Sequence, residues 1–323
     1  MLAFSFTVPL TRIAVGGGNG GGLDPLVVGS GRAVVAAALA AVALACTRSA
    51  LPTVRQWLRL VPVSVGVVAG FPILTSLALR HTDSGHAAVV IGMLPATTAV
   101  AAVLMVGERP GRRFWVGAGC GVVATAVFSV AAYGSVAAPG IADVYLFGAV
   151  ALAAVGYAQG GRMARELGAW QTVSWALLLA LPAMAILSAW SVSVHPPSAS
   201  PGQWAAFGYL CAVSMYLGFF AWYRGLAIGP MTTVSQVQLV QPVLSVIWGV
   251  LLLGERLSAP LVVGAIGVIG CAAFTVRSRS RIAHRPGTGD QVRRRDRGAE
   301  SPHGRHTRSA SNRSTLNVHI DSG

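Results

Sequence analysis

Three polar side chains recur on one face of an apolar segment near residue 240. Gln238, Gln241 and Ser245 are spaced by three and then four residues, which places them along one side of a helix. Amide groups among apolar residues need hydrogen-bond partners, so several on one face can line a cavity that binds a polar small molecule. The other interpretation, which stays open, is that they join neighbouring helices without touching any ligand.

A second cluster, in the stretch RHTDSGH, brings two imidazoles and a carboxylate close together. His81, Asp83 and His86 have the chemistry of a metal site or a proton relay. We favour a solvated turn that caps the following helix, because no second group of ligands occurs in the chain. The cysteines also lack metal-ligand spacing, so we expect no metal and no cofactor, and we interpret them as packing residues: Cys46, Cys120, Cys211 and Cys271.

The elements that carry these residues are long and apolar. Of the 323 residues, 54% are hydrophobic and 11% are charged, whereas a soluble domain carries about a quarter charged residues. Apolar runs of about 20 residues, each sufficient to cross a bilayer as a helix, follow one another along most of the chain. We predict an all-α membrane protein with about ten transmembrane helices, at 1–15, 26–46, 60–79, 86–106, 112–133, 141–159, 170–190, 203–222, 231–253 and 259–276.

The first of these segments is short. A helix over 1–15 would reach about 22 Å, less than the apolar thickness of a bilayer, which is about 30 Å. The segment also lacks the basic region and the cleavage site of a signal peptide. We therefore expect that its start lies upstream or that its first turns are incomplete.

The placement of arginine predicts the orientation in the membrane. With the N-terminus inside, the inner connections hold most of the arginines that precede the tail, whereas the outer ones hold little beyond Arg80 and Arg256. This asymmetry agrees with the excess of positive charge on cytoplasmic loops, so we expect both termini in the cytoplasm and the protein in the plasma membrane. The inner arginines are Arg48, Arg55, Arg59, Arg109, Arg112, Arg113, Arg162, Arg165 and Arg224.

The residues after the last apolar run differ in composition from all that precede them. The stretch 277–323 is rich in Arg, Ser, Gly and Thr and holds few large apolar residues, so we predict a disordered cytoplasmic tail. It is interpreted as a solvated topology anchor, and binding of its arginines to anionic lipids is the alternative. Nucleic acid is not expected as a partner, because no aromatic residue interleaves with these arginines.

Two similar stretches, LMVGERPGRR and LLLGERLSAP, show that the chain is duplicated. An offset of 147 residues superimposes the two Gly-Glu-Arg triplets, and the same offset matches Pro95 with Pro242 and Thr98 with Ser245. Five helices per unit is an odd number, so the second repeat must enter the membrane from the opposite side and the repeats are inverted. The triplet residues are Gly107, Glu108 and Arg109 in the first repeat and Gly254, Glu255 and Arg256 in the second.

The triplets and the prolines suggest different roles. Each Gly can end a helix in a left-handed conformation, and each Glu precedes the next helix, whose positive dipole end favours it. We interpret the triplets as structural turns, with a gating role as the alternative. A proline inside a helix removes one backbone hydrogen bond, so Pro95 and Pro242 are either packing kinks or hinges beside a central site.

Three further residues are candidates for the substrate path: Arg32, Thr98 and Tyr216. Arg32 lies about a quarter of the way into the second segment, and we favour the interpretation that its side chain extends to the outer headgroups. The alternative is that Arg32 faces the cavity and attracts an anionic group of the substrate. Tyr216 can supply an aromatic wall, whereas for Trp222 and Tyr223 we expect anchoring at the membrane interface.

Taken together, these features resemble the EamA family of the drug/metabolite transporter superfamily. The resemblance rests on the duplicated five-helix unit, the proline of the fourth helix, the Gly-Glu-Arg turn, the Gly-rich fifth helix and the stretch LDPLVVGSGRAVVAAAL. It covers 1–134 and 141–276, one five-helix repeat each, and leaves out 277–323. The resemblance implies a ten-helix secondary transporter of small metabolites, often an exporter.

We therefore expect a secondary transporter that moves an amino-acid-like or related metabolite by alternating access. An integral-membrane enzyme would need a Ser/His/Asp set, paired acids or a metal cluster, and no such set converges in the sequence, so we do not expect an enzyme. A channel or another non-transporting membrane module is the remaining alternative. The expected partners are the small-molecule substrate and the lipid bilayer, and a homodimer stays an open expectation.

Overall fold

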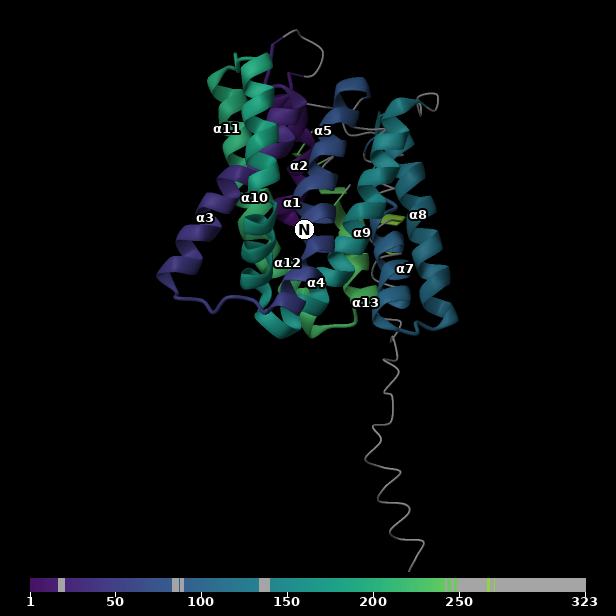
Figure 1. Ribbon diagram of the computed structural model, residues 1–323. Coiled ribbons are helices and arrows are strands. Elements are labelled where there is room, and N and C mark those ends of the chain that lie inside the picture. Colours follow the sequence, from purple (N-terminus) through teal and green to yellow (C-terminus); the bar gives the residue numbers. More distant parts are fainter. Residues whose placement is uncertain are drawn as a thin grey trace, which may run out of the picture. The chain divides into compact units, whose positions relative to one another are not determined.

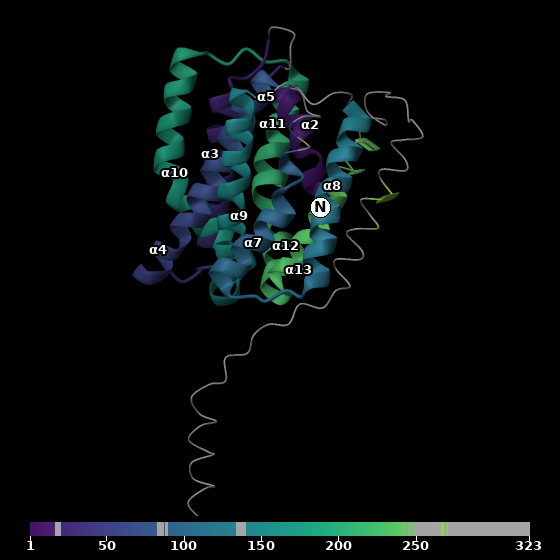
Figure 2. The same cartoon turned by 90° about the vertical axis from the view of Figure 1, so that its right-hand side faces the viewer.

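The chain folds into a bundle of helices, which Figures 1 and 2 show from two sides. The structure is a computed structural model that describes residues 1–16, 21–82, 87, 90–133, 140–241, 243–244, 247–248, 266–267 and 270. Helices are the regular elements of this part of the chain, as the sequence predicts. Several predicted features lie outside the described residues: Asp83, His86, Pro242, Ser245, Gly254, Glu255, Arg256 and the tail 277–323.

The first half of the chain contributes four groups of helical elements. The N-terminal segment comprises α1 (Leu2–Ser5) and α2 (Thr7–Ala14). A π-helical segment, η1 (Val27–Gly31), then runs directly into α3 (Arg32–Cys46). The third group is a continuous run of α4 (Val54–Val63), π-helical η2 (Ser64–Gly70) and α5 (Phe71–His81). The fourth group consists of α7 (Leu94–Val106) and α8 (Arg112–Tyr133).

The second half begins with two long helices, α9 (Ile141–Leu167) and α10 (Ala169–Val194). A continuous run of α11 (Pro201–Tyr209), π-helical η3 (Leu210–Leu217) and α12 (Gly218–Ile228) follows. The described chain then continues through α13 (Met231–Ser235) into a 3₁₀-helical turn, η4 (Gln236–Leu239).

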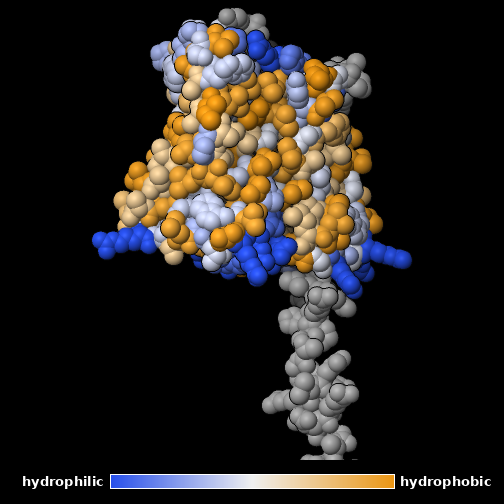
Figure 3. All heavy atoms as spheres, in the orientation of Figure 1, coloured by the Kyte–Doolittle hydropathy of each residue, from blue (hydrophilic) through white to orange (hydrophobic). Residues whose placement is uncertain are grey.

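Five helices of the described chain are long and apolar enough to cross a membrane. They are Val27–Cys46, Val54–His81, Ile141–Leu167, Ala169–Val194 and Pro201–Ile228, and Leu2–Ala14 and Leu94–Val106 are shorter apolar helices. Figure 3 shows an apolar band around these helices, with hydrophilic residues gathered toward the two ends. Exposed Val42, Leu104 and Ile186 contribute to the apolar surface. Such a surface suits lipid rather than water, whereas the full set of ten helices stays a prediction.

Two runs of 28 residues, Val54–His81 and Pro201–Ile228, are related by the same offset of 147 residues as the Gly-Glu-Arg triplets. Each begins with a capping box, formed by Thr53 and Gln56 in one and by Ser200 and Gln203 in the other. Each also contains a π-helical segment near its middle. Figures 1 and 2 show that the chain runs in opposite directions through α4–α5 and α11–α12, so this pair of helices has the relation expected of inverted repeats.

Helix α9 begins the second half of the chain but contacts helices of both halves. It packs against α4, η2, α5 and α7 of the first half and against α10 and α12 of the second. Small residues allow this close approach: a Cβ placed on Gly66 would meet the carbonyl oxygen of Leu152, and one on Gly156 would meet the Val67 side chain at 2.6 Å. Elements from both halves therefore share one core around α9.

The predicted segment 86–106 differs from expectation in one respect. A turn at Gly92 and Met93 precedes α7, so Pro95 lies in the first helical turn rather than in the middle of a helix. A proline in the first turn costs no intrahelical hydrogen bond, because the amide group there has no partner in the helix. Pro95 thus marks the start of a helix, whereas the sequence predicts a kink inside one.

Candidate functional site

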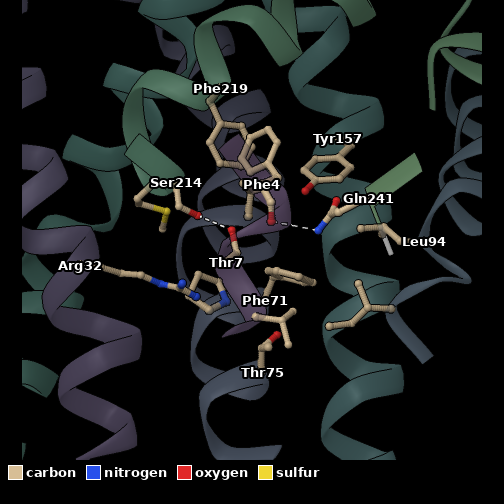
Figure 4. A pocket seen from close by; sticks show the side chains of 15 residues that line it. Phe4, Thr7, Arg32, Phe71, Thr75, Leu94, Tyr157, Ser214, Phe219 and Gln241 are labelled. Carbon is tan, nitrogen blue, oxygen red and sulfur yellow. Dashed lines mark hydrogen bonds between the residues drawn. The ribbon is translucent and has the colours of Figure 1, made fainter. Parts of the chain in front are cut away.

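A cavity lies inside the bundle. It is lined by residues of both halves of the chain, including Phe4 and Thr7 near the N-terminus, Phe71 and Thr75 of α5, Tyr157 of α9 and Ser214 of η3 (Figure 4). A cavity inside the bundle with a mainly apolar lining and a few polar groups is typical of sites for small molecules. This cavity is therefore the candidate site.

Helical geometry is irregular at the cavity. Arg32 directly follows η1, Phe71 directly follows η2, and Ser214 lies within η3, and all three residues line the cavity. π-helical segments are rare and occur often at functional sites. Within a membrane, backbone that departs from the α-helix is tolerated where protein or a cavity surrounds it. Three such segments beside one cavity support its assignment as the site.

Two hydrogen bonds connect the polar residues of the lining. Thr7 Oγ1 lies 2.8 Å from Ser214 Oγ, and Gln241 Nε2 donates to the carbonyl oxygen of Phe4 at 3.1 Å. Each bond joins the short N-terminal helices to an element of the second half (Figure 4). The N-terminal segment, which the sequence shows to be short for a membrane helix, thus forms part of the cavity wall.

Arg32 faces the cavity and does not extend to the headgroups. Its residue surface is only 2% exposed, it lines the cavity, and Figure 4 shows its guanidinium group pointing inward. The Nε atom is buried without a hydrogen-bond partner among the described residues. The favoured sequence interpretation, extension to the outer headgroups, is therefore wrong. Arg32 is the first residue of α3 and directly follows the π-helical segment η1.

Of the amides predicted to share one face, Gln241 lines the cavity, whereas Gln238 lies behind its wall. Gln238 is buried, and its side chain lies beside Tyr157, whose ring lines the cavity. Gln238 lies within the 3₁₀-helical turn η4, whereas Gln241 follows that turn. Gln238 therefore contacts the lining indirectly.

Thr98 and Tyr216 do not reach the cavity. Thr98 is fully buried in α7, and its hydroxyl has no hydrogen-bond partner among the described residues. The Tyr216 hydroxyl lies 3.0 Å from Ser174 Oγ of α10, and its ring packs edge-on against Phe220. Both residues contribute to helix packing in this structure.

Trp222 and Tyr223 are buried, which corrects the expectation of interfacial anchors. Trp222 is 5% exposed and Tyr223 is 0% exposed. The Trp222 ring packs edge-on against Tyr157, with centroids 5.4 Å apart, and the Tyr223 ring lies 5.4 Å from Phe219. These aromatic residues support the cavity wall from behind, because α12 packs on α9 rather than on lipid at this depth.

The carbonyl group of Pro95 joins α7 to the ninth predicted helix. It lies 3.2 Å from both Ser235 Oγ and Gln236 Nε2, which donate to it. Pro95 thus stands beside η4, at the point where both helices depart from regular α geometry. This contact shows that two irregular segments, one from each half, meet inside the bundle.

The first Gly-Glu-Arg triplet forms a turn whose acid binds a different helix from the one expected. Gly107 ends α7 in the left-handed conformation, with φ of 77°, as predicted. The Glu108 carboxylate, 3% exposed, accepts hydrogen bonds from the backbone amides of Met231 at 2.7 Å and Thr232 at 2.9 Å. It therefore caps α13 of the second half, and not α8, which follows it in the chain. Arg109 is exposed.

Two arginines of α9 bind helix ends close to this turn. Arg162 Nη1 donates to the carbonyl oxygen of Met105, in the last turn of α7, at 3.0 Å. Arg165 Nε donates to the carbonyl oxygen of Ala227, in the last turn of α12, at 3.0 Å. Cations at helix C-termini and an anion at a helix N-terminus are favourable arrangements. The contacts join α7, α9, α12 and α13 at one end of the bundle.

Asp24 has a similar role at the opposite end of the bundle, where α5 and α10 end; the ends of these helices can be followed in Figures 1 and 2. Its Oδ1 accepts hydrogen bonds from the Leu26 amide at 2.9 Å and from Ser191 Oγ of α10 at 2.8 Å. Its Oδ2 lies 3.8 Å from Nη1 of Arg80, at the end of α5. One carboxylate thus holds the start of η1 beside the ends of α5 and α10.

The lining offers no ligand set for a metal. Within the described residues, no group of three or more His, Cys, Asp or Glu side chains is close enough to hold a metal ion. His81 ends α5, and the rest of its predicted cluster lies outside the described part. The chemistry that the described cavity provides is that of binding: one cation, several hydroxyl groups and aromatic rings.

Sequence reasoning missed most of the lining residues. Phe4, Thr7, Tyr157 and Ser214 lie in four separate stretches and follow no common spacing, so periodicity cannot group them. The sequence did contain one signal. The capping boxes at Thr53 and Ser200 lie at equivalent positions of the two repeats, so they align the runs that follow them, and the middle parts of these runs face the cavity. The sequence repeat thus held more information on the site than the triplets alone.

Comparisons with known proteins agree with this architecture. A model of the EamA-like transporter family matches residues 1–130 and 140–277. A protein of Bacillus subtilis (strain 168) with the name Uncharacterized transporter YdeK is 39% identical over 285 residues, which make up 86% of this chain and 94% of that protein. One solved crystal structure superposes with a TM-score of 0.65 at 20% sequence identity, over 85% of this chain and 97% of that one. At this identity the structural likeness shows the fold alone.

Proposed function

The chain belongs to the EamA-like transporter family, and on that premise we propose that it carries a small molecule across the plasma membrane through the cavity. The protein is a multi-pass membrane transporter, in agreement with the family match, the 39% identical transporter and the apolar helices. The observation that supports the cavity as the transport site is its position: it lies among elements of both halves, at the depth where three helices become π-helical.

We further propose that transport follows alternating access, with the two ends of the bundle opening in turn. The Glu108 contacts with α13 hold one end closed, and the Asp24 contacts with Ser191 and Arg80 hold the other. A carrier of this kind must break one set while keeping the other. The predicted orientation puts the Glu108 end in the cytoplasm, and export is proposed on the family resemblance alone.

The experiment that tests transport uses purified protein in sealed vesicles and a panel of labelled metabolites. Saturable uptake or efflux, with counterflow when unlabelled compound is present on the opposite side, is expected. Leu94→Trp should abolish it, because Leu94 lines the cavity and the larger indole would fill it. Leu104→Trp is the matched control, since Leu104 lies on the same helix α7 and is 79% exposed.

Other outcomes separate the alternatives. Flux that rises linearly with concentration and shows no counterflow would indicate a channel rather than a carrier. Chemical conversion of a compound by the purified protein would indicate a membrane enzyme. Equal loss of transport in Leu94→Trp and Leu104→Trp would remove the cavity from the transport path.

A further inference from the structure

The cavity contains a buried cation, Arg32, and no described residue of the lining carries a negative charge to pair with it. Arg32 is the sole charged side chain among the described lining residues. Asp24, eight positions earlier, is engaged with Ser191 and Arg80 at the end of the bundle. An isolated charge inside a membrane protein is costly, and arginine at such depth is normally paired with an anion.

The rest of the lining is suited to an apolar body. Aromatic rings of Phe4, Phe71, Tyr157 and Phe219 line the space together with aliphatic side chains. In Figure 4 the Arg32 guanidinium enters from one side, whereas Tyr157, Leu94 and Gln241 lie on the opposite side. The site thus has a cationic end and a largely apolar end.

We propose that the substrate is an organic anion with an apolar or aromatic body, and that its carboxylate binds Arg32. The planar guanidinium can donate two parallel hydrogen bonds to a carboxylate, and the unpartnered Nε is one of the donors available for such a fork. Thr7 and Ser214, whose hydroxyl groups are bonded to each other, lie on the side of the cavity near Arg32, and the hydroxyl that accepts in this pair can donate to a carboxylate oxygen there (Figure 4). The aromatic rings enclose the body of the molecule.

This inference rests on the proposed function and changes one sequence expectation. An amino-acid-like substrate is a zwitterion, whose ammonium group also needs a partner of opposite charge. The described lining contains a cation and contains no carboxylate. An organic acid without an amino group therefore fits the described site better than an amino acid does.

The test compares four compounds that share one phenyl body and differ in charge. They are 3-phenylpropionate, its uncharged amide 3-phenylpropionamide, the cation 3-phenylpropylamine and the zwitterion phenylalanine. Binding to purified protein is measured by titration calorimetry. The acid is expected to bind roughly tenfold or more tightly than the amide, because a hydrogen bond to a charged group is stronger than one between neutral groups.

Two substitutions at Arg32 connect the preference to this side chain. Arg32→Gln should reduce the preference for acid over amide to about onefold, and Arg32→Lys should retain part of it. Arg55→Gln removes one arginine from the exposed surface of α4 and should leave the preference unchanged. The comparison of acid with amide on the unsubstituted protein needs no variant, so it stands even if Arg32→Gln does not fold.

The outcomes also distinguish this inference from the transport proposal. Equal affinity for acid and amide, preference for the amine or for phenylalanine, or no binding of any of the four would overturn the anion site. Transport of phenylalanine or of the amine in vesicles, without binding of the acid, would also overturn the anion site but would support the transporter function. Binding of the acid through Arg32 without vesicle transport of any compound would support the anion site and contradict the transport proposal.

Discussion

The carboxylate of Glu108 lies 2.7 Å from the backbone nitrogen of Met231, which follows it by 123 positions in the chain. An acid in a turn of the first half therefore caps a helix that begins in the second half. Charge-assisted bonds of this kind are stronger than bonds between neutral groups, and a buried carboxylate that lost its donors would be costly. The turn thus connects the two halves.

Glu108→Ala should lower the stability of the folded protein by about 1.5–3 kcal/mol, because the two amides at the start of α13 lose a charged acceptor. Glu108→Gln should cost less, since one carbonyl oxygen remains. The melting temperature in detergent measures the effect. Glu166→Ala is the control, because its ion pair with Arg59 is solvent-exposed and should contribute about 0–1 kcal/mol. Similar losses at Glu108 and Glu166 would contradict the capping role.

Gln241→Leu should weaken binding by roughly 5- to 150-fold for a substrate that carries a polar group at this end of the cavity, because leucine leaves that group unpaired. Gln238→Leu should act mainly on the melting temperature, since Gln238 is buried beside Tyr157 and does not line the cavity. Affinity and melting temperature are measured on both variants. A lowered melting temperature with unchanged affinity in Gln241→Leu would show that both amides serve helix packing.

A membrane-impermeant maleimide should label a cysteine placed at Ser198 from outside the cell and should spare one placed at Gly289. Ser198 is exposed between α10 and α11, on the side predicted to be external. The measurement uses sealed cells and a background in which all four native cysteines are replaced by serine. Labelling at Gly289 in intact cells would contradict the inverted-repeat topology.

Gly66→Ala should lower stability by about 1–3 kcal/mol, because the added methyl group would meet the carbonyl oxygen of Leu152 on α9. Gly208→Ala offers a matched control in α11, where nothing lies within 4 Å of the added atom. That change should be neutral or stabilise the helix by up to about 1 kcal/mol. Unfolding followed in detergent compares the two, and equal effects would argue against close contact of η2 with α9.

The sequence predicted the helical class because apolar runs of membrane length need no tertiary information. It also predicted the left-handed end of α7 at Gly107, since a glycine after an apolar run is a local signal. It did not predict which helix Glu108 caps, because the sequence neighbour α8 and the spatial neighbour α13 are equally acceptable by charge. The partner of a cap depends on the packing of the two halves.

The site was harder to predict for a related reason. Arg32 and Gln241 were singled out as polar residues in apolar runs, and both line the cavity. The sequence favours an outward direction for Arg32, because long basic side chains in membrane helices usually extend to the headgroups, whereas the packing of the bundle buries this one. Trp222 and Tyr223 were placed at the interface because amphipathic aromatics usually lie there, whereas packing on α9 buries them.

The three π-helical segments also bear on how related carriers can diverge. A π turn holds about one residue more than an α turn, so deleting a single residue from Val27–Gly31, Ser64–Gly70 or Leu210–Leu217 could restore a regular helix there. The helix beyond would keep its register against its neighbours, while the cavity beside the deletion would change shape. Insertions and deletions of one residue at these three places would thus alter what such a carrier accepts without altering how it folds.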